Sequence, residues 1–313
     1  MLRLIVRRVL LMLLTAIAVS ALLFFTVTQL LGSPAEMMLG QDASPQAIAA
    51  LNAKYGFDRP AVFQYLHWLG SALSGDLGRS YTTQQSVAAA IAARFPVTLE
   101  LSFWSIALAV TAAVASSTIP VARRQLQPLV AAASLIGITV PNFMLGVSLI
   151  FLLSVKLHLL PSTGWVPWSD GVGVHLQHMI MPVLTLSAYY FGAIGIVYRA
   201  EYQNVIQRQF IQVARAKGLS LWRVAFRHAA PNAILPVITF VGISVGQLTG
   251  GAVVTETIFS MPGTGRLFVT SIESRDFPVM LAIGMLIVVG VVLMNLLADI
   301  GYGVANPQIR HQS

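Results

Sequence analysis

The sequence predicts an all-α integral membrane protein with six transmembrane helices. Of its 313 residues, 56% are hydrophobic and only 10% are charged, and the mean hydropathy is +0.77, whereas soluble domains carry about 25% charged residues. We expect an anchor span with an external helical segment in residues 1–95 and a five-span core in residues 96–313. Windows free of Asp, Glu, Lys and Arg, each long enough for a helix to cross the hydrocarbon, occupy residues 9–31, 101–122, 125–155, 171–198, 229–255 and 277–298.

The distribution of positive charge predicts the orientation of these spans. An even number of spans places both termini on one side, and twelve of the 19 Lys and Arg residues then lie on that side. Cytoplasmic loops carry the excess of Lys and Arg, so both termini are expected in the cytoplasm. The net charge of +8 is therefore attributed to topology, which argues against nucleic-acid binding. Cysteine is absent, which excludes disulfides and thiolate metal sites.

The first span is expected to be retained, because its apolar run is too long for a signal peptide. Two short external helices follow it. Ser44 and Pro45 form a helix start, and Gly56 ends that helix. A second helix opens after Pro60 and ends near Gly75. Its aromatic side chains are interpreted as interfacial anchors or packing groups, with contact to a soluble partner as the alternative.

Residues 199–232, called the basic segment below, separate the fourth and fifth spans and include the predicted coupling loop, residues 200–231. They hold six basic residues against one acid, Glu201. A helix is expected over residues 203–217 and ends at Gly218, which suits a left-handed position. Ser220 caps a second short helix, whose apolar face comprises Leu221, Val224 and Ala225. We interpret the segment as a docking element, with adsorption to anionic lipid as the alternative.

Prolines and glycines punctuate the remaining spans. Pro141 and Pro182 predict kinks in the third and fourth spans. In the fifth span, small residues recur every four positions, which favours close helix packing and is compatible with lining a narrow pore; they are Gly242, Gly246 and Gly250. After this span, residues 256–266 contain one Pro and two Gly, which predicts an external turn that dips back towards the membrane.

Few residue patterns point to chemistry within the chain. Ser244 sits in a Gly-x-Ser-x-Gly pattern, but a nucleophile elbow needs a strand–turn–helix setting that a span does not provide. His175 and His178 could hold a transition metal together with Asp170; a solvated pair of loop histidines is the alternative. No phosphate-binding G-x-x-x-x-G-K-[ST] motif occurs, and the spans carry no mid-membrane charge. Energy for any pumping is therefore expected from a partner.

The chain resembles the permeases of ABC importers in the dipeptide, oligopeptide and nickel branch. The likeness begins in the basic segment, with Gln212-Val-Ala-Arg-Ala-Lys-Gly218, His228 and Asn232, and extends over nearly the whole chain. Other matching stretches are Tyr55-Gly-Phe-Asp-Arg-Pro60, Gly75-Asp-Leu-Gly-Arg-Ser80, Arg94-Phe-Pro-Val-Thr-Leu-Glu100, Pro141-Asn-Phe143, Leu160-Pro-Ser-Thr-Gly164, Glu256-Thr-Ile-Phe259, Pro262-Gly-Thr-Gly-Arg266 and Arg275-Asp-Phe-Pro278.

This resemblance implies a multi-pass subunit of the bacterial inner membrane that is not itself an enzyme. It implies a heterodimer with a second homologous permease, two ATPase subunits that bind ATP and Mg²⁺, and a periplasmic or extracellular solute-binding protein. The residues implied in ATPase coupling are Gln212, Ala214, Arg215, Gly218, Ser220, Arg223, His228 and Asn232. Those implied along the path and at its outer mouth are Gly242, Gly246, Gln247, Gly250, Glu256, Pro262, Gly263, Gly265 and Arg266.

The sequence departs from the family pattern in three places. Gln212 replaces a glutamate, Ser33 replaces an aspartate before a proline, and residues 306–308 read Asn-Pro-Gln instead of Asp-Pro-Arg. The substitution at Gln212 removes a potential salt bridge to the ATPase. The expected cargo is a dipeptide, an oligopeptide or a related small solute, with nickel or a metal chelate as the alternative. The alternative from another functional class is a stand-alone channel or secondary carrier.

Overall fold

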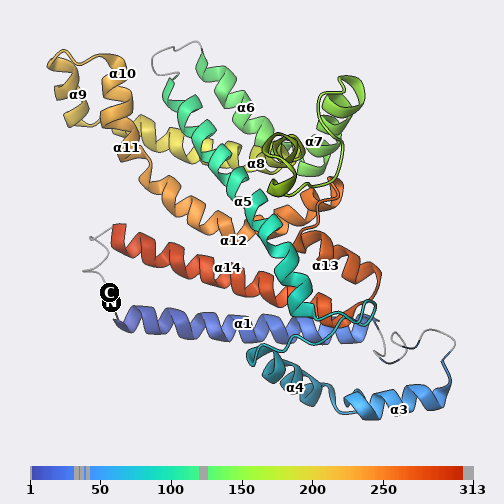
Figure 1. The fold of residues 1–313 in the computed structure, drawn as a ribbon. Coiled ribbons are helices and arrows are strands. Elements are labelled where there is room, and N and C mark those ends of the chain that lie inside the picture. The colour runs from blue at the N-terminus through green and yellow to red at the C-terminus, as the bar shows by residue number, and fades with distance from the viewer. Residues whose placement is uncertain (1, 32–34, 36–38, 40–42, 120–125, 306–313) are drawn as a thin grey trace. The chain divides into compact units, whose positions relative to one another are not determined.

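Helices make up the fold in the computed structural model, which describes residues 2–31, 35, 39, 43–119 and 126–305 (Figure 1). Within these residues, β structure is limited to one bridge between Arg79 and Ser86. The chain divides into two compact units, Met1–Thr98 with Pro262–Leu293 and Leu99–Met261 with Met294–Ser313. Two long helices, α5 (Val87–Thr118) and α14 (Phe277–Ala305), contribute residues to both units.

In the first unit, the short helix α4 packs on the first span. It contains α1 (Leu2–Leu31), α3 (Pro45–Tyr55), α4 (Ala61–Leu73), α13 (Thr264–Glu273) and the adjoining parts of α5 and α14. Ser44 Oγ accepts a hydrogen bond from the Ala47 amide, and Gly56 has φ 71°, which confirms both predicted ends of α3. The ring of Tyr65 on α4 lies 5.6 Å from that of Phe24 on α1. The α4 aromatics therefore serve in part as packing groups.

The second unit is built around one central helix, α8 (Val172–Ile206), which contacts α6, α7, α11 and α12. The other elements are α6 (Gln127–Thr139), α7 (Asn142–Leu149), η3 (Ile150–Lys156), η4 (Trp168–Asp170), α9 (Gln209–Ala216), α10 (Leu221–Arg223), η5 (Val224–Ala229), α11 (Ala230–Ala233) and α12 (Leu235–Ile258). The helix α6 approaches α8 closely at two glycines: a Cβ on Gly192 would lie 2.3 Å from the Ser134 carbonyl oxygen, and one on Gly137 would lie 2.4 Å from that of Ala188.

Length and hydropathy support four to six spans in the described residues. Four single helices pass this test, at Val9–Thr28, Val87–Thr118, Val172–Ile206 and Phe277–Leu296, and two bent helix pairs raise the number to six if each is one span. The first pair, Gln127–Thr139 and Asn142–Lys156, occupies the predicted third span, and its two helices meet at an angle of 106°. The second pair joins Leu221–Ala233 to Leu235–Gly242 at 43°.

The two prolines behave differently. At Pro141 the helix is interrupted, because Val140 adopts an extended conformation with ψ 121°, the region favoured before proline. The expected kink is therefore a full break between α6 and α7. In contrast, Pro182 lies inside the single helix α8 and is itself buried, so the helix continues through it. The predicted turn at residues 123–128 falls largely outside the described residues.

Candidate functional site

The basic segment folds into a helical hairpin at the end of α8. The prediction of one continuous helix over residues 203–217 is wrong, because α8 ends at Ile206 and α9 begins at Gln209. Between them, Arg208 is extended, with φ −67° and ψ 147°. This break redirects the chain so that α9 contacts both η5 and α8, and tertiary packing has overridden a helix-compatible sequence.

Helix α9 buries one narrow face and exposes its charges. Ile211 and Ala214 are buried, whereas Gln212 and Arg215 are exposed. The helix ends at Gly218, whose φ of 78° is the left-handed conformation that the sequence predicts. Its amide donates to the Arg215 carbonyl at 2.9 Å. This turn fixes the direction in which the chain enters the next helical stretch.

Ser220 begins that stretch as predicted, with its Oγ accepting from the Arg223 amide. The helical run is longer than expected, because η5 and α11 continue it to Ala233. Val224 and Ala225 are buried, but Leu221 is 55% exposed, so it does not share their packed face. At the far end, Asn232 Nδ2 donates to the His228 carbonyl at 2.7 Å.

The hairpin exposes both large apolar side chains and cations. The apolar side chains lie on α9, α10 and η5 and are together called the hairpin face below; they are Phe210, Val213, Leu221, Trp222 and Phe226. The Trp222 and Phe226 rings are stacked, with centroids 5.4 Å apart and planes 7° apart. The neighbouring exposed cations are Arg215, Lys217, Arg223 and Arg227. Large apolar side chains rimmed by polar ones mark interaction surfaces.

The residues predicted along the path fall in both units. Gly242 is half-buried, Gly250 is exposed with open space where a Cβ would lie, and Glu256 is fully buried, all on α12 in the second unit. Gly246 and Gln247 belong to α12, but their burial is not among the features that the structure describes. The others belong to the first unit, where Gly263 and Gly265 are buried, Arg266 is half-buried and Pro262 is exposed.

The two histidines considered as candidate metal ligands are engaged within the chain instead. His175 is fully buried on α8, so the alternative of a solvated loop pair is also wrong for this residue. Its Nδ1 lies 2.6 Å from the Val166 carbonyl oxygen and its Nε2 lies 3.0 Å from Glu100 Oε1. The Trp168 ring stacks on it at 3.8 Å and donates its own Nε1–H to Glu100 at 2.8 Å. Both ring nitrogens of His175 are thus engaged within the chain.

His178 is half-buried, and its Nδ1 lies 2.9 Å from the Val174 carbonyl oxygen one turn earlier on α8. No group of three potential metal ligands occurs among the residues that the structure describes. Ser244 is 2% exposed within the continuous helix α12. This is not the strand–turn–helix setting of a nucleophile elbow, and the hydrolase pattern is coincidental.

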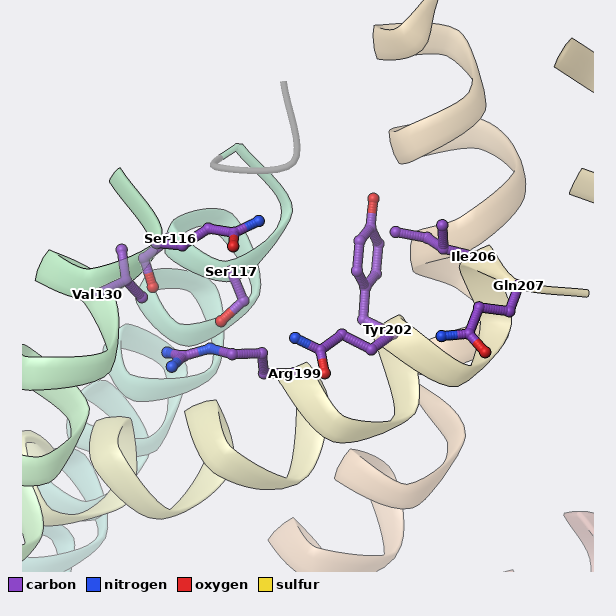
Figure 2. A pocket seen from close by; sticks show the side chains of 9 residues that line it. Ser116, Ser117, Val130, Arg199, Tyr202, Ile206 and Gln207 are labelled. Carbon is purple, nitrogen blue, oxygen red and sulfur yellow. The ribbon is translucent and has the colours of Figure 1, made fainter. Parts of the chain in front are cut away.

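A cavity of about 280 Å³ lies where α8 passes α5 and α6, and the sequence analysis missed it. Figure 2 shows Arg199 extending from α8 towards Ser116, Ser117 and Val130, while Tyr202 rises beside Ile206. Gln127, Gln203 and Gln207 complete the lining. The one available sequence signal was Arg199, the first charge after the fourth span, because the partners come from helices distant in sequence.

Comparison with known proteins covers the chain from end to end. Residues 105–311 match the family model described as binding-protein-dependent transport system inner membrane component, and residues 1–102 match the N-terminal model of the same membrane component. The chain is 37% identical over 314 residues to the glutathione transport system permease protein GsiC of Escherichia coli strain K12, covering all of both chains. The same protein from Shigella boydii serotype 4 is 36% identical over the same full coverage.

Proposed function

Because the chain belongs to the family of binding-protein-dependent transport system inner membrane components, we propose that it works as one of two homologous permease subunits enclosing the path of an ATP-driven importer. It is a multi-pass inner-membrane protein, with both termini assigned to the cytoplasm by its charge distribution. ATP and Mg²⁺ bind to two partner ATPase subunits, and a solute-binding protein delivers the cargo from outside. The sequence supports this division of labour, since it lacks a phosphate-binding loop.

The observation that carries the proposal is the hairpin face of the basic segment. It presents stacked aromatic side chains beside four cations on a hairpin held by the Gly218 turn and the Ser220 cap. Aromatic and Arg side chains supply most of the binding energy at protein interfaces. A partner can move α8 through this hairpin only if it binds one arrangement of the permease more tightly than the other. The ATPase is the partner that we assign to this surface.

The cargo that we propose is a small peptide-like solute. Relatives that match the whole chain are named as glutathione permeases, and glutathione combines amide groups with carboxylates. For nickel or a metal chelate, the chain offers no comparable support, because His175 has both ring nitrogens engaged. A stand-alone channel or secondary carrier is the competing class; it predicts solute flux from this chain reconstituted without companions, whereas the importer predicts none.

The test of coupling is a substitution in the turn. A β-branched side chain at Gly218 cannot easily adopt φ 78°, and the left-handed conformation costs non-glycine residues about 1–2 kcal/mol. Gly218→Val should therefore lower ATP-dependent glutathione uptake by vesicles holding the complete transporter, while the amount of inserted protein stays unchanged. A Cβ at this position meets no atom within 4 Å, so steric collision does not explain the loss.

Gly218→Asn is the matched control, because asparagine enters the left-handed region more readily than other side chains. It should retain most of the uptake. The coupling assignment fails if the valine variant transports at the wild-type rate, or if both variants lose uptake equally with normal insertion and normal complex assembly.

A further inference from the structure

The cavity beside Arg199 has the composition of a binding site for an anion. Its lining comes from α5, α6 and α8, and its volume of about 280 Å³ would hold on the order of nine waters at liquid density. One lining residue is a cation, six others carry hydroxyl or amide groups, and none is an acid. Figure 2 shows the Arg199 side chain reaching over the space between α8 and the two serines of α5.

The positive charge of Arg199 has no carboxylate partner among the described residues. The hydrogen bond recorded for its guanidinium goes to Ser134 Oγ, at 3.1 Å from Nη2. The acid nearest in sequence, Glu201, instead pairs with Arg208 at 3.4 Å. A half-buried guanidinium carries five N–H donors in a planar fork that matches a carboxylate. Arg199 therefore retains donors for an anionic group in the cavity.

Two buried hydroxyl groups in the lining also lack partners. Ser117 and Tyr202 are 5% and 1% exposed, and neither hydroxyl oxygen has a hydrogen-bond partner in the described part of the chain. The adjacent pair, Thr118 and Tyr198, is satisfied, with its hydroxyl oxygens 2.8 Å apart. That pair joins α5 to α8. The Ser117 and Tyr202 hydroxyl oxygens each expose less than 1 Å², so they lie behind the surface of the cavity, and Arg199 is the donor that the cavity offers to an anion.

We propose that this cavity binds the carboxylate end of a small peptide-like solute, with the Arg199 guanidinium donating to the carboxylate. Gln127, Gln203 and Gln207 then pair with its amide groups, since each glutamine side chain can both donate to and accept from an amide. These amides favour a peptide over a lipid phosphate, which has no amide to match. The identity of the solute rests on the proposed function, whereas the site rests on the cavity.

The location gives this site a consequence for transport. Gln203 lies in the last turn of α8, and Gln207 is the residue that caps this helix before the chain enters α9. A ligand that bridges α5 and α8 holds this end of α8 in place, and therefore restrains the basic segment that follows. Solute that has reached the cytoplasm would in this way slow further import.

The test measures binding to the full-length chain alone, in nanodiscs of phosphatidylcholine, by isothermal titration calorimetry. The probes are glutathione, glutathione diethyl ester (in which both carboxylates are masked) and inorganic phosphate. Glutathione should bind, and the ester should bind at least about tenfold more weakly, the change expected for losing a charge-assisted hydrogen bond. Arg199→Gln should cause a similar loss.

Arg208→Gln is the control, because this exposed cation, which lies between α8 and α9, is absent from the lining and its replacement should leave affinity unchanged. Thermal unfolding of each variant verifies folding. The proposal is overturned if glutathione does not bind, if the ester or phosphate binds equally well, if Arg199→Gln binds like wild type, or if phosphatidylglycerol nanodiscs abolish binding by occupying the site. Because the binding assay contains no ATPase, a lack of glutathione binding would not contradict the importer proposal. Conversely, a lack of uptake by the complete transporter would not contradict this binding site.

Discussion

Replacing Gly192 by alanine tests the contact between α6 and α8. The new Cβ would lie 2.3 Å from the Ser134 carbonyl oxygen and 2.8 Å from Ile138 Cγ1, far inside the separation of about 3.5–4.0 Å at which non-bonded atoms attract. The obstruction on one side is backbone, which cannot rotate away, so the two helices must separate by about 1 Å. Overpacking of this kind costs typically about 1–3 kcal/mol.

The assay is reversible unfolding of the purified chain in mixed micelles with increasing dodecyl sulfate, followed by tryptophan fluorescence. Gly192→Ala should lower the free energy of unfolding by about 1–3 kcal/mol. Gly173→Ala, on the same helix but with nothing within 4 Å of its new Cβ, should be neutral or slightly stabilising, because alanine has the higher helix propensity. Equal stability of the Gly192 variant and wild type would show that α6 and α8 do not pack in this way.

Two further predictions concern buried polar clusters, one in each unit. His175→Ala removes one of the two recorded partners of Glu100 Oε1 and should cost about 1–3 kcal/mol in the same unfolding assay; an unchanged midpoint would contradict the contact. In the first unit, buried Asp276 accepts hydrogen bonds from the hydroxyls of Ser80 and Thr82. Asp276→Asn keeps one acceptor oxygen in place of two and should speed proteolysis of the segment around Ser80, while equal cleavage rates would refute this role.

Features governed by local rules could be predicted from the sequence. The membrane class followed from composition, because too few charged residues are present to cover a soluble surface of this size. Ser44 and Gly56 delimit α3, and Gly218 adopts the left-handed conformation, since caps and glycine turns depend on a few neighbouring backbone groups. The Ser220 cap was predictable for the same reason.

Features governed by contacts between distant residues could not be predicted in this way. Pro141 breaks its span at 106°, more than the expected kink, whereas Pro182 lies within a continuous helix. The sequence around each proline does not reveal which neighbours satisfy the freed backbone groups. Similarly, the helix-compatible run through Gln207 is interrupted because α9 packs against η5. The cavity beside Arg199 was missed because its hydroxyl groups come from helices far apart in the chain.

The glycines show why a motif alone does not locate a helix contact. The stripe in the fifth span suggested close approach at α12, but Gly250 faces open space, whereas Gly137 and Gly192 bring α6 and α8 together. A missing Cβ matters only where another backbone occupies its place, which depends on the partner helix. Ser134 connects this contact to the proposed site, because its carbonyl meets Gly192 and its hydroxyl accepts from Arg199. Any movement that separates α6 from α8 must therefore also displace the cation of the cavity.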